Sequence, residues 1–174
     1  AYVVAGSGRN LGRLVWAARL DPTSYPLRLE LAARLPCARA RPHARAVLEG
    51  LNDPENLGAI ARSARALGID ALVLDPTCID PYTRRTVRVS MGEILFLPAC
   101  RVPADDWPAA TFATLHDAGF ETWAMTPAEG SDDIWALPVP ERVAIVLGAE
   151  GPGLSRRVLA AATRRVLLPI HPAV

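Results

Sequence analysis

The chain has 174 residues, about half of them hydrophobic, which is enough for one domain with a substantial core or for one domain with an appendage. Its 19 basic residues, all of them arginine, nearly balance 18 acidic ones and leave a formal net charge of +1. The apolar runs are short and no basic-then-apolar leader opens the chain, so the composition argues against a membrane-spanning protein and predicts a cytoplasmic one.

The first 44 residues are the basic end of the chain. Residues 1–50 hold eight arginines against three acidic residues, a net charge of +5, whereas the remainder carries −4. The run RLPCARARPHAR (34–45) suits either a phosphate backbone or a solvated linker or helix face. A glycine turn and the break DPTSYP (21–26) interrupt the pattern too often for an independent domain. We therefore expect residues 1–44 to be a basic appendage or the remnant of a substrate-binding region.

A glycine turn near the start has some features of a nucleotide site. Gly6, Gly8 and Gly12 follow the strand-like AYVV and precede a helical pattern. Their spacing is G-x-G-x-x-x-G, and no second strand ending in an acidic residue follows, so a plain loop is the first interpretation. A site for an NADP-type nucleotide is the alternative.

From residue 45 onward, short apolar runs alternate with helical patterns, which predicts an α/β domain over 45–174 with a mainly parallel sheet flanked by helices. The expected strands are Ala46–Glu49, Ala71–Leu74, Ile94–Leu97, Glu121–Met125, Ala144–Leu147 and Arg165–Leu168. The expected helices are Leu57–Leu67, Trp107–Ala118 and Ser155–Ala162, with Gly68 and Gly119 at helix ends.

Polar side chains follow the first of these strands, in LEGLNDPENLGAIARSARALGID (48–70). Asn56 is suited to cap the helix, or to orient a ligand at the helix's positive end. Gly58, one turn before Arg62, would leave the guanidinium open to a substrate. Spacing alone favours an ordinary amphipathic helix with solvated arginines, but open α/β sheets place their sites just after strands.

A second glycine-rich turn lies in VAIVLGAEGPGLS (143–155). Its order, Gly148-x-x-Gly151-x-Gly153, matches neither the dinucleotide turn nor a P-loop, and Glu150 would repel a pyrophosphate. The loop suits a ligand with amines, hydroxyls or a cationic centre, held by main-chain groups that glycines leave bare. A purely structural turn is the competing interpretation.

The metal-ligating residue types are scattered. Cys37, Cys78 and Cys100 lie far apart without a C-x-x-C pair, and the three histidines are equally dispersed. We therefore expect buried thiols and no metal site.

Taken together, these segments resemble the SpoU (TrmH-like) branch of the SPOUT RNA methyltransferases over roughly residues 45–174. NDPENLGAIARSARALGID resembles the family's first motif, with Asn56 and Arg62 at the matching positions. LGAEGPGLS resembles the second, with Glu150 at the matching glutamate, and LLPIHPAV the beginning of the third. The segment DPYTRRTVRVSMGEILFLP (80–98) is similar to the linking segment of ribosomal-RNA members.

The resemblance implies a trefoil-knotted α/β fold, a homodimer, bound S-adenosylmethionine and methyl transfer to a ribose 2′-hydroxyl of RNA. Family members continue into a serine-leucine-asparagine stretch and a knot helix, whereas the printed sequence ends at Val174. The implied catalytic residues are Asn56, Arg62 and Glu150. The implied cofactor-binding residues are Thr126, Pro127, Leu147, Gly148, Gly151, Leu168 and Ile170, and the expected RNA contacts are Arg65, Arg84, Arg85 and Arg88.

A mechanism follows from these assignments. A guanidinium stays protonated in proteins, so we expect Arg62 to orient the hydroxyl and stabilise the developing oxyanion while the proton leaves through phosphate or water. Glu150 is expected either to position Asn56 or the arginine, or to face the cofactor's positive end. Ribosomal RNA is the expected substrate. The alternatives are transfer RNA, a non-catalytic RNA-binding protein of the same fold, and the nicotinamide-nucleotide protein suggested by residues 5–12.

Overall fold

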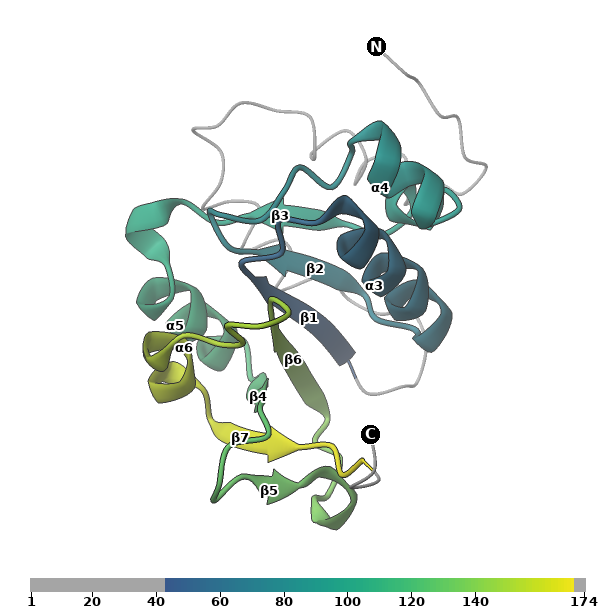
Figure 1. Cartoon of the computed structure of the whole chain (residues 1–174). Coiled ribbons are helices and arrows are strands. Elements are labelled where there is room, and N and C mark those ends of the chain that lie inside the picture. Colours follow the sequence, from purple (N-terminus) through teal and green to yellow (C-terminus); the bar gives the residue numbers. More distant parts are fainter. Residues whose placement is uncertain (1–42, 171–174) are drawn as a thin grey trace.

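The computed structural model describes residues 43–170, and Figure 1 shows how their helices and strands are arranged. The glycine turn at 5–12, the appendage up to Pro42, Cys37 and His171 lie outside these residues. The strands are β1 (His43–Glu49), β2 (Ala71–Leu74), β3 (Ala99–Arg101), β4 (Glu121–Met125), β5 (Asp132–Asp133), β6 (Arg142–Gly148) and β7 (Arg164–Leu167). The α-helices are α3 (Pro54–Leu67), α4 (Arg84–Val89), α5 (Ala109–Asp117) and α6 (Arg156–Ala161), with short 3-10 helices η2 (Glu93–Leu95), η3 (Ala104–Asp106) and η4 (Ile134–Ala136).

The seven strands form one sheet in the order β3-β2-β1-β6-β4-β7-β5. Every pairing between neighbours is parallel, which confirms the predicted fold class. β1 and β6 lie at its centre and pair from His43 opposite Arg142 to Glu49 opposite Gly148. Because all strands are parallel, their carboxyl ends share one edge of the sheet, and the loops that follow them meet there.

The sheet is covered on both faces, as its strand sequences require (Figure 1). Along β1, Ala46 and Leu48 belong to a cluster with Leu57, Ala61 and Ala64 of α3, whereas Val47 belongs to the opposite cluster. That opposite cluster contains Phe112 and Leu115 of α5 and Val158 of α6. Strands buried on both faces are apolar at successive positions, which is why β2 reads as an unbroken apolar run.

The predicted strand at Ile94–Leu97 is wrong. Glu93–Leu95 is a 3-10 helix that follows Gly92, and the third strand of the sheet is Ala99–Arg101. Ile94 and Leu97 are almost completely buried, whereas Phe96 is 41% exposed. Two buried residues three positions apart are typical of a helical turn, so the apolar run buries one side of a turn and forms no strand.

The linking segment contains a helix that the apolar pattern did not predict. Thr83 caps α4 by accepting a hydrogen bond from the Thr86 main-chain nitrogen, and α4 packs against α3. Gly58 of α3 is buried at this contact, where a Cβ atom would lie 2.8 Å from the Val89 Cβ and 3.0 Å from the Thr86 carbonyl oxygen. The expectation that Gly58 exposes Arg62 is therefore corrected. The absence of a side chain at Gly58 allows α4 to pack closely against α3.

This contact carries a stability prediction. Gly58→Ala should lower the free energy of unfolding by about 1–3 kcal/mol, because the main-chain carbonyl of Thr86 cannot move aside without shifting α4. Urea unfolding followed by circular dichroism measures the change. The double variant with Val89→Ala keeps the Cβ contact at 2.8 Å and removes only the Val89 Cγ1 contact at 3.0 Å, so it should recover only a small part of the loss. Equal stability of Gly58→Ala and the parent would contradict close packing here.

Both described cysteines, Cys78 and Cys100, are buried, as predicted. Burial raises the pKa of Cys78 to about 12, and the hydrogen bond and negative charge of Asp75 act in the same direction. The thiolate is the reactive form of cysteine, so Cys78 is inert at neutral pH.

Candidate functional site

The candidate site lies where the loops after β1, β6 and β4 meet. Glu49 and Gly148 end paired strands, and the Thr126 main-chain nitrogen donates a hydrogen bond to the Val166 carbonyl of β7 at 2.9 Å. The first and second motifs, together with Thr126, Pro127 and Leu168, therefore follow adjacent strands at one edge of the sheet. The sequence placed these segments after strands, but only the strand order makes them neighbours.

The glycine loop after β6 is a closed turn with a bare main chain. Gly153 donates a main-chain hydrogen bond to the Ala149 carbonyl at 3.0 Å, and Gly151 and Gly153 have φ of +90° and +66°. A Cβ atom on Gly148 would lie 2.3 Å from the Gly153 carbonyl carbon and 2.6 Å from the Leu154 nitrogen. The returning chain thus passes directly over Gly148, and only glycine fits there. Gly151, Pro152 and Gly153 are exposed.

A carboxylate that the sequence did not single out holds the exit of this loop. Glu49 accepts hydrogen bonds from the Ser155 main-chain nitrogen at Oε2 and from the Ser155 Oγ at Oε1, both at 2.8 Å. Its Oε1 also accepts from the Trp107 indole nitrogen at 3.3 Å. Ser155 in turn caps α6 by accepting from the Val158 nitrogen. The only available signal was an acidic residue at the end of an apolar strand.

The predicted capping role of Asn56 is wrong. The N-cap of α3 is Asp53, whose side chain accepts from the Glu55 nitrogen at 2.8 Å, and Pro54 begins the helix. A proline tolerates the first helical position because the missing N–H has no partner there. Asn56 lies in the first turn, half-buried, and its side chain makes no hydrogen bond to a described residue.

The other two predicted catalytic residues are exposed and differently placed. Arg62 lies in the middle of α3, about 12 Å along the helix axis from Pro54 at 1.5 Å per residue. Glu150 lies on the glycine loop. Among the described residues no hydrogen bond or ion pair joins Asn56, Arg62 and Glu150 to one another, and neither Arg62 nor Glu150 has a described ionic partner.

Two of the predicted cofactor residues are exposed apolar side chains at the carboxyl edge of the sheet. Leu168 and Ile170, which follow β7, are 47% and 67% exposed, although they are large apolar side chains. Leu147 and Thr126 are half-buried and Pro127 is exposed. Bare main chain and exposed aliphatic side chains at the same edge of the sheet suit a ligand with both hydrogen-bonding and apolar surfaces.

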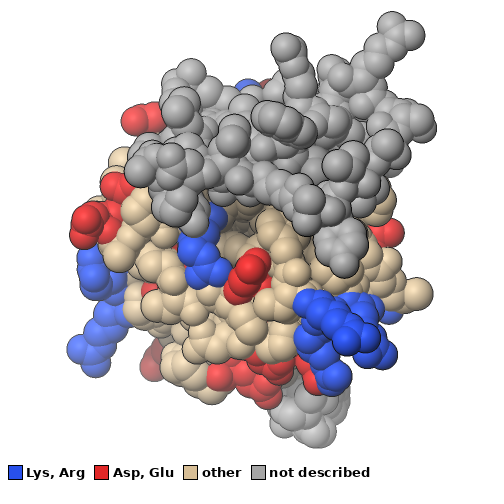
Figure 2. Space-filling model, turned by 90° about the horizontal axis from the view of Figure 1, so that it is seen from above, with Lys and Arg blue, Asp and Glu red and all other residues tan. Residues whose placement is uncertain are grey.

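The arginines predicted to contact RNA surround the junction of α3 and α4. Arg65 pairs with Glu93 at 3.5 Å and Arg85 pairs with Glu55, whereas Arg84 and Arg88 have no ionic partner among the described residues. On the face seen in Figure 2, basic side chains form separate groups with acidic side chains between them. On this face, a phosphate backbone would therefore meet separate basic groups and no continuous basic surface.

Residues 43–170 lack the features of two other classes of site. No group of three histidine, cysteine or acidic side chains in this range is placed to hold a metal ion. None of the helices in the same range has the length and apolar character that crossing a membrane requires.

Residues 43–174 match the model of the SpoU rRNA Methylase family. An uncharacterised tRNA/rRNA methyltransferase of Mycobacterium tuberculosis is 46% identical over 128 residues, which are 72% of this chain and 43% of the relative. The AdoMet-bound rRNA methyltransferase of Sinorhizobium meliloti superposes with a TM-score of 0.67 at 27% identity, covering 75% of this chain and 50% of that one. The crystal structure of an RNA 2′-O ribose methyltransferase gives a TM-score of 0.64 at 29% identity, covering 79% and 51%.

The chain thus spans about half the length of these relatives. The family model covers about three quarters of the chain, including both motifs at the carboxyl edge of the sheet. The chain belongs to the SpoU rRNA methylase family.

Proposed function

We propose that the protein transfers a methyl group from S-adenosylmethionine to a ribose 2′-hydroxyl of ribosomal RNA. The observation that carries the proposal is the bare main chain of residues 148–153, beside the start of α3, in a chain of the SpoU family. The AdoMet-bound Sinorhizobium structure supports the cofactor, and the RNA 2′-O ribose methyltransferase supports the reaction.

The residues at the edge of the sheet fit this cofactor. The close pass of Gly153 over Gly148 leaves exposed peptide groups for an adenosine moiety, and Leu168 and Ile170 offer apolar contact. Thr126, Pro127, Leu147 and Gly151 complete the proposed pocket. When bound, S-adenosylmethionine supplies an electrophilic methyl group.

The chain's own contribution to the reaction is to bind and orient the ribose. A hydroxyl is a poor nucleophile at neutral pH, so its oxygen must be held in line and its developing negative charge stabilised. Arg62 has no described ionic partner and is proposed to donate to this oxygen, from the same subunit as the loop or from the second subunit of the predicted homodimer. The hydroxyl proton leaves to phosphate or water. Asn56 and Glu150 are proposed to orient the ribose and the reactive centre, and Arg65, Arg84, Arg85 and Arg88 to contact phosphates.

Transfer RNA is the second candidate substrate, because the mycobacterial relative's name covers both RNA classes. The test incubates the full-length protein with isotopically labelled S-adenosylmethionine and either ribosomal subunits or transfer RNA, followed by nucleoside mass spectrometry. We expect a 2′-O-methylated nucleoside from ribosomal RNA. Label in transfer RNA alone would identify transfer RNA as the substrate. Label on a base would refute methylation of the ribose. RNA binding without any methyl transfer would favour a non-catalytic RNA-binding protein.

A further inference from the structure

We infer that Glu49 is the positioning residue of the glycine loop, and that its ionised carboxylate fixes the main chain against which the methyl donor binds. The inference rests on the proposed function for the identity of the ligand. It assigns to Glu49 a role that neither motif carries, since Glu49 precedes the first motif and lies 106 residues from its partner Ser155.

Glu49 holds both ends of the loop. Its main chain pairs with Gly148 at the loop's entrance through the β1–β6 register. Its side chain accepts two hydrogen bonds of 2.8 Å from Ser155 at the loop's exit. The separation of entrance and exit is therefore set by one residue of the central strand, and the intervening residues 149–154 are closed across a fixed base.

The geometry requires an acceptor at both carboxylate oxygens. The Ser155 main-chain N–H points at Oε2 and the Trp107 indole N–H at Oε1, and neither group can act as an acceptor. A glutamine would place an NH₂ group opposite one of these donors. The ionised carboxylate satisfies both and also accepts from the Ser155 hydroxyl.

The same carboxylate ties the loop to the helices behind it. Trp107 packs edge-on against buried Phe112 of α5 with ring centroids 5.9 Å apart, and its carbonyl accepts from Arg157 of α6 at 3.2 Å. Loop, α5 and α6 thus share one anchor at the end of β1. Loss of the Glu49 contacts should loosen the loop without removing any group that touches the ligand.

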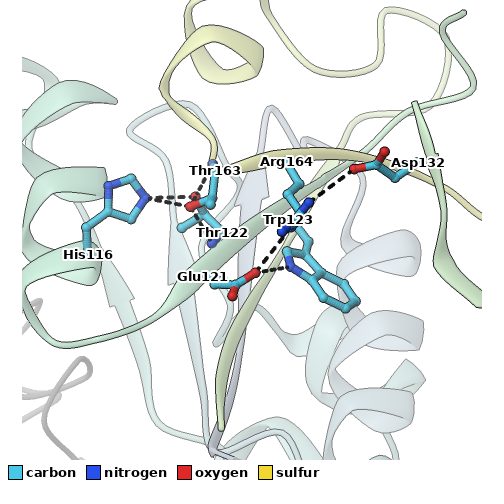
Figure 3. A network of polar contacts seen from close by, with 7 residues as sticks. All are labelled: His116, Glu121, Thr122, Trp123, Asp132, Thr163 and Arg164. Carbon is cyan, nitrogen blue, oxygen red and sulfur yellow. Dashed lines mark hydrogen bonds and ion pairs between the residues drawn. The ribbon is translucent and has the colours of Figure 1, made fainter. Parts of the chain in front are cut away.

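Glu121, at the amino ends of the strands, provides a matched control, and Figure 3 shows its contacts. Glu121 begins β4 and, like Glu49, is half-buried and accepts from an indole: the Trp123 Nε1 donates to its Oε2 at 3.1 Å. The same oxygen lies 3.4 Å from the Arg164 Nε. Glu121→Gln therefore disturbs a comparable network at the amino end of the strands, away from the glycine loop.

The test uses the full-length protein, with titration calorimetry of S-adenosylmethionine and hydrogen exchange of the free protein. Glu49→Gln should weaken cofactor binding severalfold, up to about tenfold, because either the half-buried Trp107 indole N–H or the exposed Ser155 main-chain N–H loses its acceptor. It should speed exchange in the peptide covering 148–155, and leave the KM for RNA within about twofold of the parent. Glu121→Gln should change neither the affinity nor the exchange of this peptide.

Ser155 provides a second pair of variants in case Glu49→Gln folds poorly. Ser155→Ala removes the hydroxyl that bridges Glu49 and the start of α6, and should weaken cofactor binding in the same direction. Ser155→Thr keeps the hydroxyl and should restore it. Parent-like affinity and exchange in both Glu49→Gln and Ser155→Ala would overturn the inference alone, whereas failure of the parent protein to bind S-adenosylmethionine would overturn the proposed function.

Discussion

Arg62→Lys is expected to lower kcat for RNA methylation about 10²–10³-fold while S-adenosylmethionine affinity stays within about twofold. A lysine keeps the positive charge but loses the planar fork that can hold the hydroxyl oxygen and a neighbouring phosphate together. Arg62 makes no ion pair with a described residue, so the substitution breaks no such pair within residues 43–170. Single-turnover kinetics with saturating cofactor measure the rate of transfer directly.

The control for this variant is Arg165→Lys. Arg165 is an exposed arginine on β7, and like Arg62 it has no ionic partner among the described residues. It should leave transfer unchanged within the error of the assay. Near-parental turnover by Arg62→Lys would remove Arg62 from the mechanism, and an equal loss with Arg165→Lys would assign the effect to overall charge.

Gly148→Ala is expected to weaken S-adenosylmethionine binding so far that titration calorimetry no longer detects it. The new methyl group would overlap the carbonyl group of Gly153 and the Leu154 nitrogen, at 2.3–2.6 Å, and these are main-chain atoms that no side-chain rotation can move. The loop must open, and the peptide groups proposed to bind the cofactor move with it. Isothermal titration measures the loss, and thermal unfolding reports how much stability accompanies it.

Gly68→Ala serves as the matched glycine control. Gly68 ends α3 with φ of +82° and has no atom within 4 Å of its Cβ position, so alanine costs about 1–2 kcal/mol of strain without a clash. The variant should lose stability yet bind S-adenosylmethionine like the parent. Undiminished cofactor binding by Gly148→Ala would show that the ligand does not depend on this turn.

Several strands and helices of the sheet domain could be predicted from the apolar pattern of short segments. β2 and β4 have the predicted bounds, α6 lies one residue inside its prediction at each end, and Gly68 caps α3 as expected. These segments combine an unambiguous apolar run or period with flanking glycine or serine. The strand misplaced at Ile94–Leu97 and the unpredicted α4 lie where the apolar period is ambiguous and where packing against α3 decides the conformation.

The residues of the candidate site were likewise only partly predictable from the sequence. The sequence pointed to the glycine loop and to Arg62 because unusual residue types stand just after predicted strands. It assigned the N-cap to Asn56 when Asp53 holds it, since both residues suit a cap and three positions separate them. It gave Gly58 a functional role because the α4 contact that requires glycine comes from a segment about 30 residues later in the chain.

By itself, then, the sequence determined the class of fold, the central strands and helices, and the two motifs, because these depend on the apolar period and residue type within short windows. Only the tertiary structure decided that Glu49 spans the base of the loop to Ser155, that Gly148 lies beneath Gly153, and that Gly58 admits α4. Each of these depends on which strands and helices are neighbours. Strand order and helix packing arise from the burial of the whole core, and no local pattern encodes them.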